Sequence, residues 1–114
     1  MDDYIHHISE KDFEEVCKKV ISKTKDTHTL RYIPADWEWT AYPDIGFSTI
    51  TDDHGENLTL GYHRYERMPG GKLLAEEIIR RNSDDAEFII DTKEQLLALI
   101  EETFGLTGAS KTRN

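Results

Sequence analysis

The spacing of apolar residues predicts an amphipathic helix close to the start of the chain. Ser9 is followed three residues later by Asp12, which resembles a capping box with Asp in place of the usual Glu. Apolar residues then recur at the i, i+3, i+4, i+7 and i+8 positions of one helical stripe: Phe13, Val16, Cys17, Val20 and Ile21. We expect this helix to end in the polar stretch 22–27, and residues 4–8 before it form either a short strand or a packed lead-in.

The middle of the chain has the alternating, β-rich pattern of strands. The expected strands are 29–33, which Pro34 stops, followed by 37–42, 45–51 and 58–65. The connections between them are short and contain turn residues, Pro43-Asp44 and the stretch 52–57 among them. Short connections between successive strands favour an antiparallel meander.

The last third of the sequence predicts a return to helices. After Pro69-Gly70-Gly71 we expect a helix over 72–81, because Leu74, Ala75, Ile78 and Ile79 are apolar, and then a short strand over 87–90. Thr92 and Gln95 form a capping box for a final helix. Gly105 is its expected C-cap, and its expected buried residues are Leu96, Leu97, Leu99, Ile100 and Phe104.

This order, α-β-β-β-β-α-β-α, predicts an α+β fold in which helices pack on one face of a mainly antiparallel sheet of four to five strands. We expect a single domain over 1–106 and a flexible polar tail over 107–114. The inward positions of the periodic segments predict a shared core of Phe13, Val16, Val20, Trp39, Phe47, Leu60, Ile78, Leu96 and Ile100.

Alternation along the strands also assigns the two faces of the sheet. Residues expected to face the helices are Trp37, Trp39, Phe47, Leu58, Leu60 and Tyr62. The opposite face would then carry Glu38, Thr40, Tyr42, Ser48, Ile50, Thr59, His63 and Tyr65. Tyrosines beside a carboxylate on an open sheet face suit a protein partner, although an ordinary solvated face has much the same composition.

Composition narrows the class of protein. The 114 residues are 37% hydrophobic and 32% charged, and they contain one cysteine, Cys17. A single cysteine excludes a disulfide framework and a cysteine-based zinc cluster within one chain. We find neither a membrane-spanning apolar run nor a signal peptide, so we expect a cytoplasmic protein that is not bound to a membrane.

The charge is strongly and unevenly negative. The chain has 23 acidic and 14 basic residues, a net charge of −9, and 13 of the acids but only six of the bases lie within residues 1–57. Such a chain is repelled by phosphate backbones, so we expect no direct binding to nucleic acid. A negative field instead speeds encounters with a basic protein such as a nuclease, a toxin or a nucleic-acid-binding protein.

The sequence contains no established catalytic motif, and we expect neither a cofactor nor a metal. The Gly-x-Ser-x-Gly, His-Glu-x-x-His and Walker-type patterns are absent. His54 lies among Asp52, Asp53 and Glu56, but their spacing is not that of an EF-hand loop. Cys17, on the apolar stripe of the first helix, is typical of an inert core thiol.

Three functions are compatible with these features. The first is a non-enzymatic inhibitor of a basic protein, in general character similar to small acidic immunity proteins and phage anti-defence inhibitors, including those that imitate the charge of DNA. Its expected partner-binding residues are Tyr42, Tyr65, Glu38, Asp52, Asp53 and Glu56. The second is a small enzyme or ligand-binding domain that uses His63 with Tyr42, Tyr65 or Glu38. The third is an adaptor subunit whose acidity serves only solubility.

Overall fold

The computed structural model describes residues 3–5, 7–34 and 48–106, without the side chains of Asp3, Tyr4 and His63. The elements are, in chain order, β1 (Asp3–Ile5), α1 (Glu10–Thr24), β2 (Arg31–Ile33), β3 (Ser48–Thr51), β4 (Asn57–Arg67), a 3-10 turn η2 (Pro69–Gly71), β5 (Leu73–Arg81), β6 (Glu87–Phe88) and α2 (Lys93–Phe104). The α+β class predicted from the sequence is confirmed, with six described strands instead of four to five.

The sheet is antiparallel except at one edge. Its strand order is β1-β5-β4-β3-β2, and β6 also pairs with β5. Because β4 occupies one edge of β5 along its whole length, β1 and β6 follow one another along the other edge. β1 runs parallel to β5, with Asp3 opposite Leu74 and Ile5 opposite Glu76.

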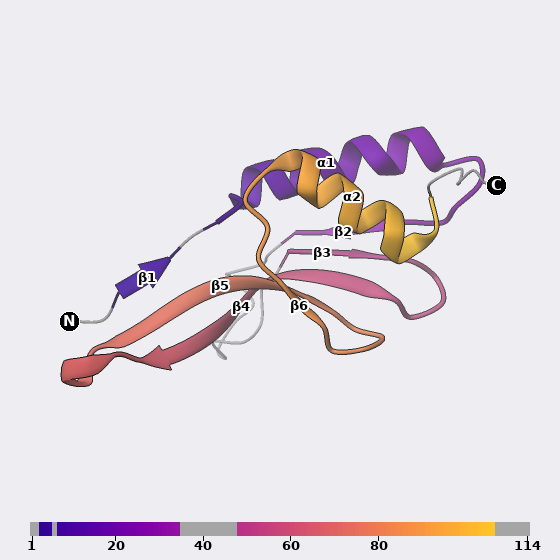
Figure 1. Ribbon diagram of the computed structural model, residues 1–114. Helices are drawn as coiled ribbons and strands as arrows, with labels where there is room; N and C mark the ends of the chain where they lie inside the picture. Colours follow the sequence, from indigo (N-terminus) through magenta and orange to yellow (C-terminus); the bar gives the residue numbers. More distant parts are fainter. Residues whose placement is uncertain (1–2, 6, 35–47, 107–114) are drawn as a thin grey trace.

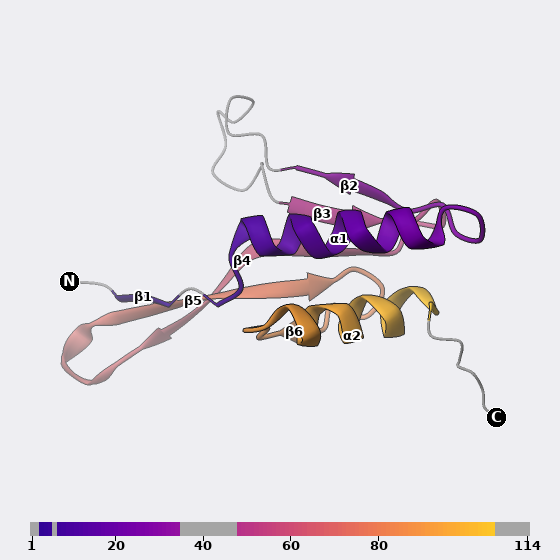
Figure 2. The same cartoon turned by 90° about the horizontal axis from the view of Figure 1, so that it is seen from above.

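Both helices lie on one face of the sheet (Figure 1), and they run side by side over it (Figure 2). The main core is formed between the two layers by residues of α1, α2, β3, β4 and β5, and the largest fully buried side chains include Phe13, Ile50, Leu58, Ile79 and Ile100. The hairpin of β4 and β5 extends beyond the helices, and we call its projecting part, residues 62–78, the hairpin arm.

The predicted helix ends are confirmed. The Ser9 side chain accepts a hydrogen bond from the backbone N–H of Asp12 at 3.1 Å. Thr92 and Gln95 form a complete capping box, and Gly105 caps α2 in the left-handed conformation at φ 66°. These are local interactions between residues three or four positions apart, so the sequence alone is sufficient to indicate them.

The helix predicted over 72–81 is wrong, because this segment is strand β5. Ala75 and Ile79 are four residues apart, a separation that keeps two side chains on the same face of a helix and of a strand alike. The segment is flanked by β4 on one side and by β1 and β6 on the other. A central strand has apolar residues on both faces, and this produces the run that resembles a helical stripe.

The sheet faces predicted for three residues are also wrong. Ser48 and Ile50 face the helices instead of the opposite side, with only 1% and 0% of their surfaces exposed. Tyr62 lies opposite Ile78, on the face away from the core, because the register between β4 and β5 shifts between Leu60 and Tyr62. Gly61, at the shift, has a φ of 117°, a conformation that glycine adopts readily.

Most of the predicted core is confirmed. Phe13, Val16, Val20, Leu60, Leu96 and Ile100 all belong to the buried cluster. Ile78 is buried but lies outside that cluster, because it neighbours the core residue Ile79 in β5 and therefore faces the other way. Leu97 is 38% exposed. Trp39 and Phe47, the strand predicted over 37–42 and the tail over 107–114 are outside the described residues.

Candidate functional site

Acidic residues that are far apart in the sequence converge at the end of the molecule where both helices finish (Figures 1 and 2). We call this region the acidic end. It consists of the α1–β2 loop (25–30), the β3–β4 turn (52–56), the β5–β6 turn (82–86) and the last turn of α2 (101–104). These four segments contain one lysine or arginine, Lys25, and eight acidic residues: Asp26, Asp52, Asp53, Glu56, Asp84, Asp85, Glu101 and Glu102.

Hydrogen bonds join the two turns of the acidic end. The Asn82 side chain donates to the carbonyl of Gly55 at 2.9 Å, and the Ser83 N–H donates to Oε1 of Glu56 at 3.1 Å. Asp52 shapes its own turn, since its Oδ1 accepts from the N–H groups of His54 and Glu56, both at 2.9 Å. Asp52 and Glu56 thus have structural roles, which the sequence did not indicate.

Asp53 is more available to a partner. Its side chain is 57% exposed, and Nε2 of the exposed His54 ring lies 3.4 Å from Oδ1 of Asp53. Asp53 lines an open cleft of about 210 Å³ beneath the turn. The cleft combines apolar Leu30 and Phe104 with polar groups, and its full lining is Thr27, His28, Thr29, Leu30, Asp52, Asp53, His54 and Phe104.

Two arginines at the end of β5 offset part of the negative charge of the acidic end. Arg80 donates to Asp85 at 2.6 Å and lies over the Tyr62 ring. Arg81 donates to both oxygens of Asp84, at 3.0 and 2.8 Å. The hydrogen bonds from Arg81 lower the pKa of Asp84 to about 2, with further contributions from the Ala86 N–H and the Arg81 charge. Asp84 is therefore ionised at every physiological pH.

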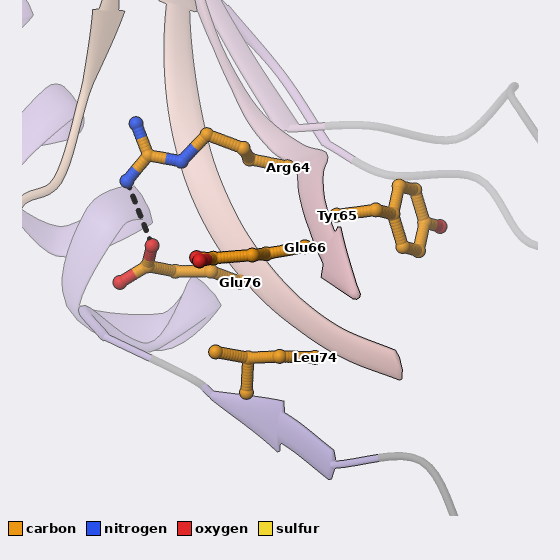
Figure 3. Close-up of a pocket in the computed structure, with 5 residues that line it drawn as sticks. All are labelled: Arg64, Tyr65, Glu66, Leu74 and Glu76. Atoms are coloured by element: carbon orange, nitrogen blue, oxygen red, sulfur yellow. Dashed lines mark hydrogen bonds and ion pairs between the residues drawn. The ribbon is translucent and has the colours of Figure 1, made fainter. Parts of the chain in front are cut away.

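The hairpin arm carries a second group of charged residues. Figure 3 shows Arg64, Glu66, Glu76 and Leu74 on one side of the hairpin and the Tyr65 ring pointing to the other side. These five residues line an open pocket of about 220 Å³. Arg64 donates to Oε1 of Glu76 at 2.8 Å. This bond, together with a bond from His7, lowers the pKa of Glu76 below its ordinary value.

His7 connects the hairpin arm to the start of α2. Its Nδ1 lies 2.5 Å from Oδ1 of Asp91 and its Nε2 lies 2.9 Å from Oε2 of Glu76, and its side chain is only 14% exposed. Burial lowers the pKa of His7, but the hydrogen bonds and charges of the two carboxylates outweigh this effect and raise the pKa above 6.5. When the ring is charged, each nitrogen carries an N–H that donates to a carboxylate, and the ring has no lone pair to act as a base.

No local pattern in the sequence indicates this hydrogen-bond network. His7 attracts attention only as one of two adjacent histidines, while its partners are 69 and 84 positions away. The pairing depends on β1 lying parallel to β5, and local periodicity carries no information about such distant pairing.

The structure separates the predicted site residues. Asp52, Asp53 and Glu56 lie together at the acidic end. Tyr65, which is 59% exposed, lies eight residues beyond Asn57 on β4, roughly 25 Å along an extended strand. Glu38 and Tyr42 are outside the described residues, as is the side chain of His63.

The described residues add three further findings. They include no group of three or more His, Cys, Asp or Glu side chains placed to hold a metal. Burial, followed by the charge of Glu14, raises the pKa of the Cys17 thiol far above its ordinary value, so this thiol is unreactive. No described helix has the length and apolar character that crossing a membrane requires.

Comparison with known proteins found no family model, no curated protein and no solved structure that matches this chain.

Proposed function

We propose that this protein is a non-enzymatic binding protein that inhibits or neutralises a basic protein, and that the acidic end is its contact surface. The observation that supports this most is the convergence of eight acidic residues from four separate segments at one end of the fold. The partner class is a nuclease, a toxin or another nucleic-acid-binding protein, since these present clusters of lysine and arginine.

The charge of the acidic end acts mainly on the rate of association. Clustered charges of one sign attract an oppositely charged surface over distances of about a Debye length, roughly 8–10 Å in physiological salt. Such attraction raises the association rate more than it lengthens the lifetime of the complex.

The cleft beside Asp53 supplies a specific contact. A lysine or arginine side chain combines an apolar stem with a cationic head, and the cleft offers Phe104 and Leu30 to the stem and Asp53 to the head. In this proposal the cleft supplies the specific contact, and Tyr65, an expected partner-binding residue, lies outside the contact surface because it is at the other end of β4.

The stability of the free protein provides a separate argument. Glu101 lies in the last turn of α2, which contains no basic residue, and a carboxylate there opposes the helix dipole. Glu102, in the same turn, is 3.8 Å from Arg81 and is partly compensated by it. In contrast, α1 has Lys23 in its last turn. A destabilising arrangement of charges is typical of a surface selected for binding.

The test begins with capture of partners from the native host at low salt, followed by association kinetics with the purified partner. The double variant Asp53→Asn/Glu102→Gln removes two charges from the acidic end. The control Glu14→Gln/Glu66→Gln removes two charges elsewhere, on α1 and the hairpin arm. We expect the first variant to lower the association rate about 3- to 10-fold at low salt and the control to change it less than twofold.

The proposal is wrong if no basic partner is captured, or if binding is indifferent to salt and to Asp53→Asn/Glu102→Gln. The acidity would then serve solubility, as in an adaptor subunit.

The hairpin pocket favours a second candidate, a small ligand-binding domain or enzyme. Arg64, Glu66 and Glu76 around 220 Å³ of open space could hold a small polar molecule. His63 lies on the same strand. Turnover of a small molecule that disappears in His63→Ala would favour this candidate over the inhibitor.

A further inference from the structure

The edge of β5 that β1 covers is secured by a side chain as well as by backbone pairing. β1 is only three residues long, and it contributes one short parallel ladder, from Asp3–Leu74 to Ile5–Glu76. A three-residue strand at the edge of a sheet contributes few hydrogen bonds and opens easily. His7, two residues beyond β1, adds the bridge between Glu76 of β5 and Asp91 before α2.

The chain is firmly held on the far side of His7. The Ile8 N–H donates to the carbonyl of Ile90 at 2.8 Å, and Ile8 itself is 2% exposed. Opening at His7 would therefore free β1 while Ile8 and α1 stay in place. The ionisable ring of His7 thus lies between a weakly paired strand, β1, and the firmly held residue Ile8.

We propose that His7 is a proton-dependent latch, which holds β1 against β5 when the imidazole is charged and lets β1 leave the edge of β5 when it is neutral. A charged ring donates one N–H to each carboxylate. A neutral ring has a single N–H, so one of the two carboxylates then faces a lone pair. The loss of one charge-assisted hydrogen bond and the repulsion that follows act directly on the junction between β1 and Ile8.

The charged groups in the network set the pH range. The described groups bonded to His7 are Glu76 on β5 and Asp91 before α2, and Arg64 on β4 is bonded to Glu76. Because the folded pKa of His7 is raised above 6.5, its contribution is complete below pH 6.5 and is lost as the pH rises through the folded value. The pKa of Glu76 is lowered from 4.5, so this carboxylate stays ionised throughout that range.

Amide hydrogen exchange tests the latch. It is measured by NMR on the full chain between pH 5.5 and 8, and each exchange rate is corrected for the intrinsic rate at that pH. In the wild type we expect protection of amides in the β1–β5 ladder to fall about tenfold across this range, while α1 amides keep theirs. The tenfold figure corresponds to the loss of about one hydrogen bond to a charged group.

Three variants separate the latch from a passive structural role. His7→Gln removes the titration and should give low protection at every pH. His7→Lys keeps a positive charge throughout pH 5.5–8 and should give protection that does not change with pH. His54→Gln, at a ring that is 86% exposed, should behave as the wild type.

The latch is refuted if ladder protection in the wild type is flat over this range, or if His7→Lys retains the wild-type decrease. If His7→Gln fails to fold, the comparison of His7→Lys with the wild type still tests whether the titration of His7 controls ladder protection.

Discussion

At the scale of single residues, neighbours in α2 differ sharply in burial. Leu96, Leu99 and Ile100 are at most 5% exposed, whereas Leu97 is 38% exposed. The sequence predicts all four on the buried side, because four apolar residues within five positions do not indicate which of them lies at the margin of the stripe. The sheet beneath the helix determines this margin, and no local pattern encodes it.

The two adjacent leucines permit a matched comparison. We expect Leu96→Ala to lower the free energy of unfolding by about 2–5 kcal/mol, because it removes a fully buried side chain and leaves a cavity. Leu97→Ala should cost about 1 kcal/mol or less, since much of that side chain is already in water. Urea denaturation of both variants measures the difference, and equal costs would contradict the burial described above.

At the scale of secondary-structure elements, the sequence predicts those elements whose interactions are between residues close in the chain. It does not predict an element whose conformation depends on pairing with distant strands. The caps of α1 and α2 were predictable because their hydrogen bonds span three or four residues. Strand β5 was not, because its central position depends on β1, β4 and β6. The acidic turns were visible as clusters, but their convergence depends on the register between β4 and β5.

The role of Gly61 in the register shift between β4 and β5 can be tested by giving this position a side chain. Gly61 has a φ of 117°, which residues with a Cβ adopt only under strain. We expect Gly61→Ala to lower the free energy of unfolding by about 1–3 kcal/mol. Chemical denaturation measures this cost, and NMR contacts of Tyr62 show whether the ring remains on the face away from the core. An unchanged stability with Tyr62 still on the face away from the core would show that the register shift does not require glycine.

At the scale of the whole molecule, charges are sorted between the two ends of the sheet. The acidic end gathers carboxylates with few cations, while on the hairpin arm Glu76 is bonded to both Arg64 and His7. Crowded like charges repel one another and oppose folding, and dissolved salt screens this repulsion. The acidic end is thus expected to reduce the stability of the free protein.

Neutralising one acidic residue of the acidic end should have opposite effects on the two properties: it should stabilise the free protein and weaken its attraction to the partner. Glu101 lies in the last turn of α2, where a negative charge opposes the helix dipole. We expect Glu101→Gln to raise the melting temperature by about 1–4 °C at low ionic strength, with a smaller gain at high salt. It should also slow association with the basic partner. A lower melting temperature at both salt concentrations would show that Glu101 supports the fold and is not a cost of binding.

The parallel pairing of β1 with β5 also fixes an order of events during synthesis. Asp3 pairs with Leu74, so β1 leaves the ribosome about 70 residues before its partner strand. At roughly 5–20 residues per second, this gap lasts about 4–14 s. β2, β3 and β4 can pair within that interval, since their contacts are closer in the sequence. The N-terminal strand is consequently the part of the nascent sheet that waits longest for its partner.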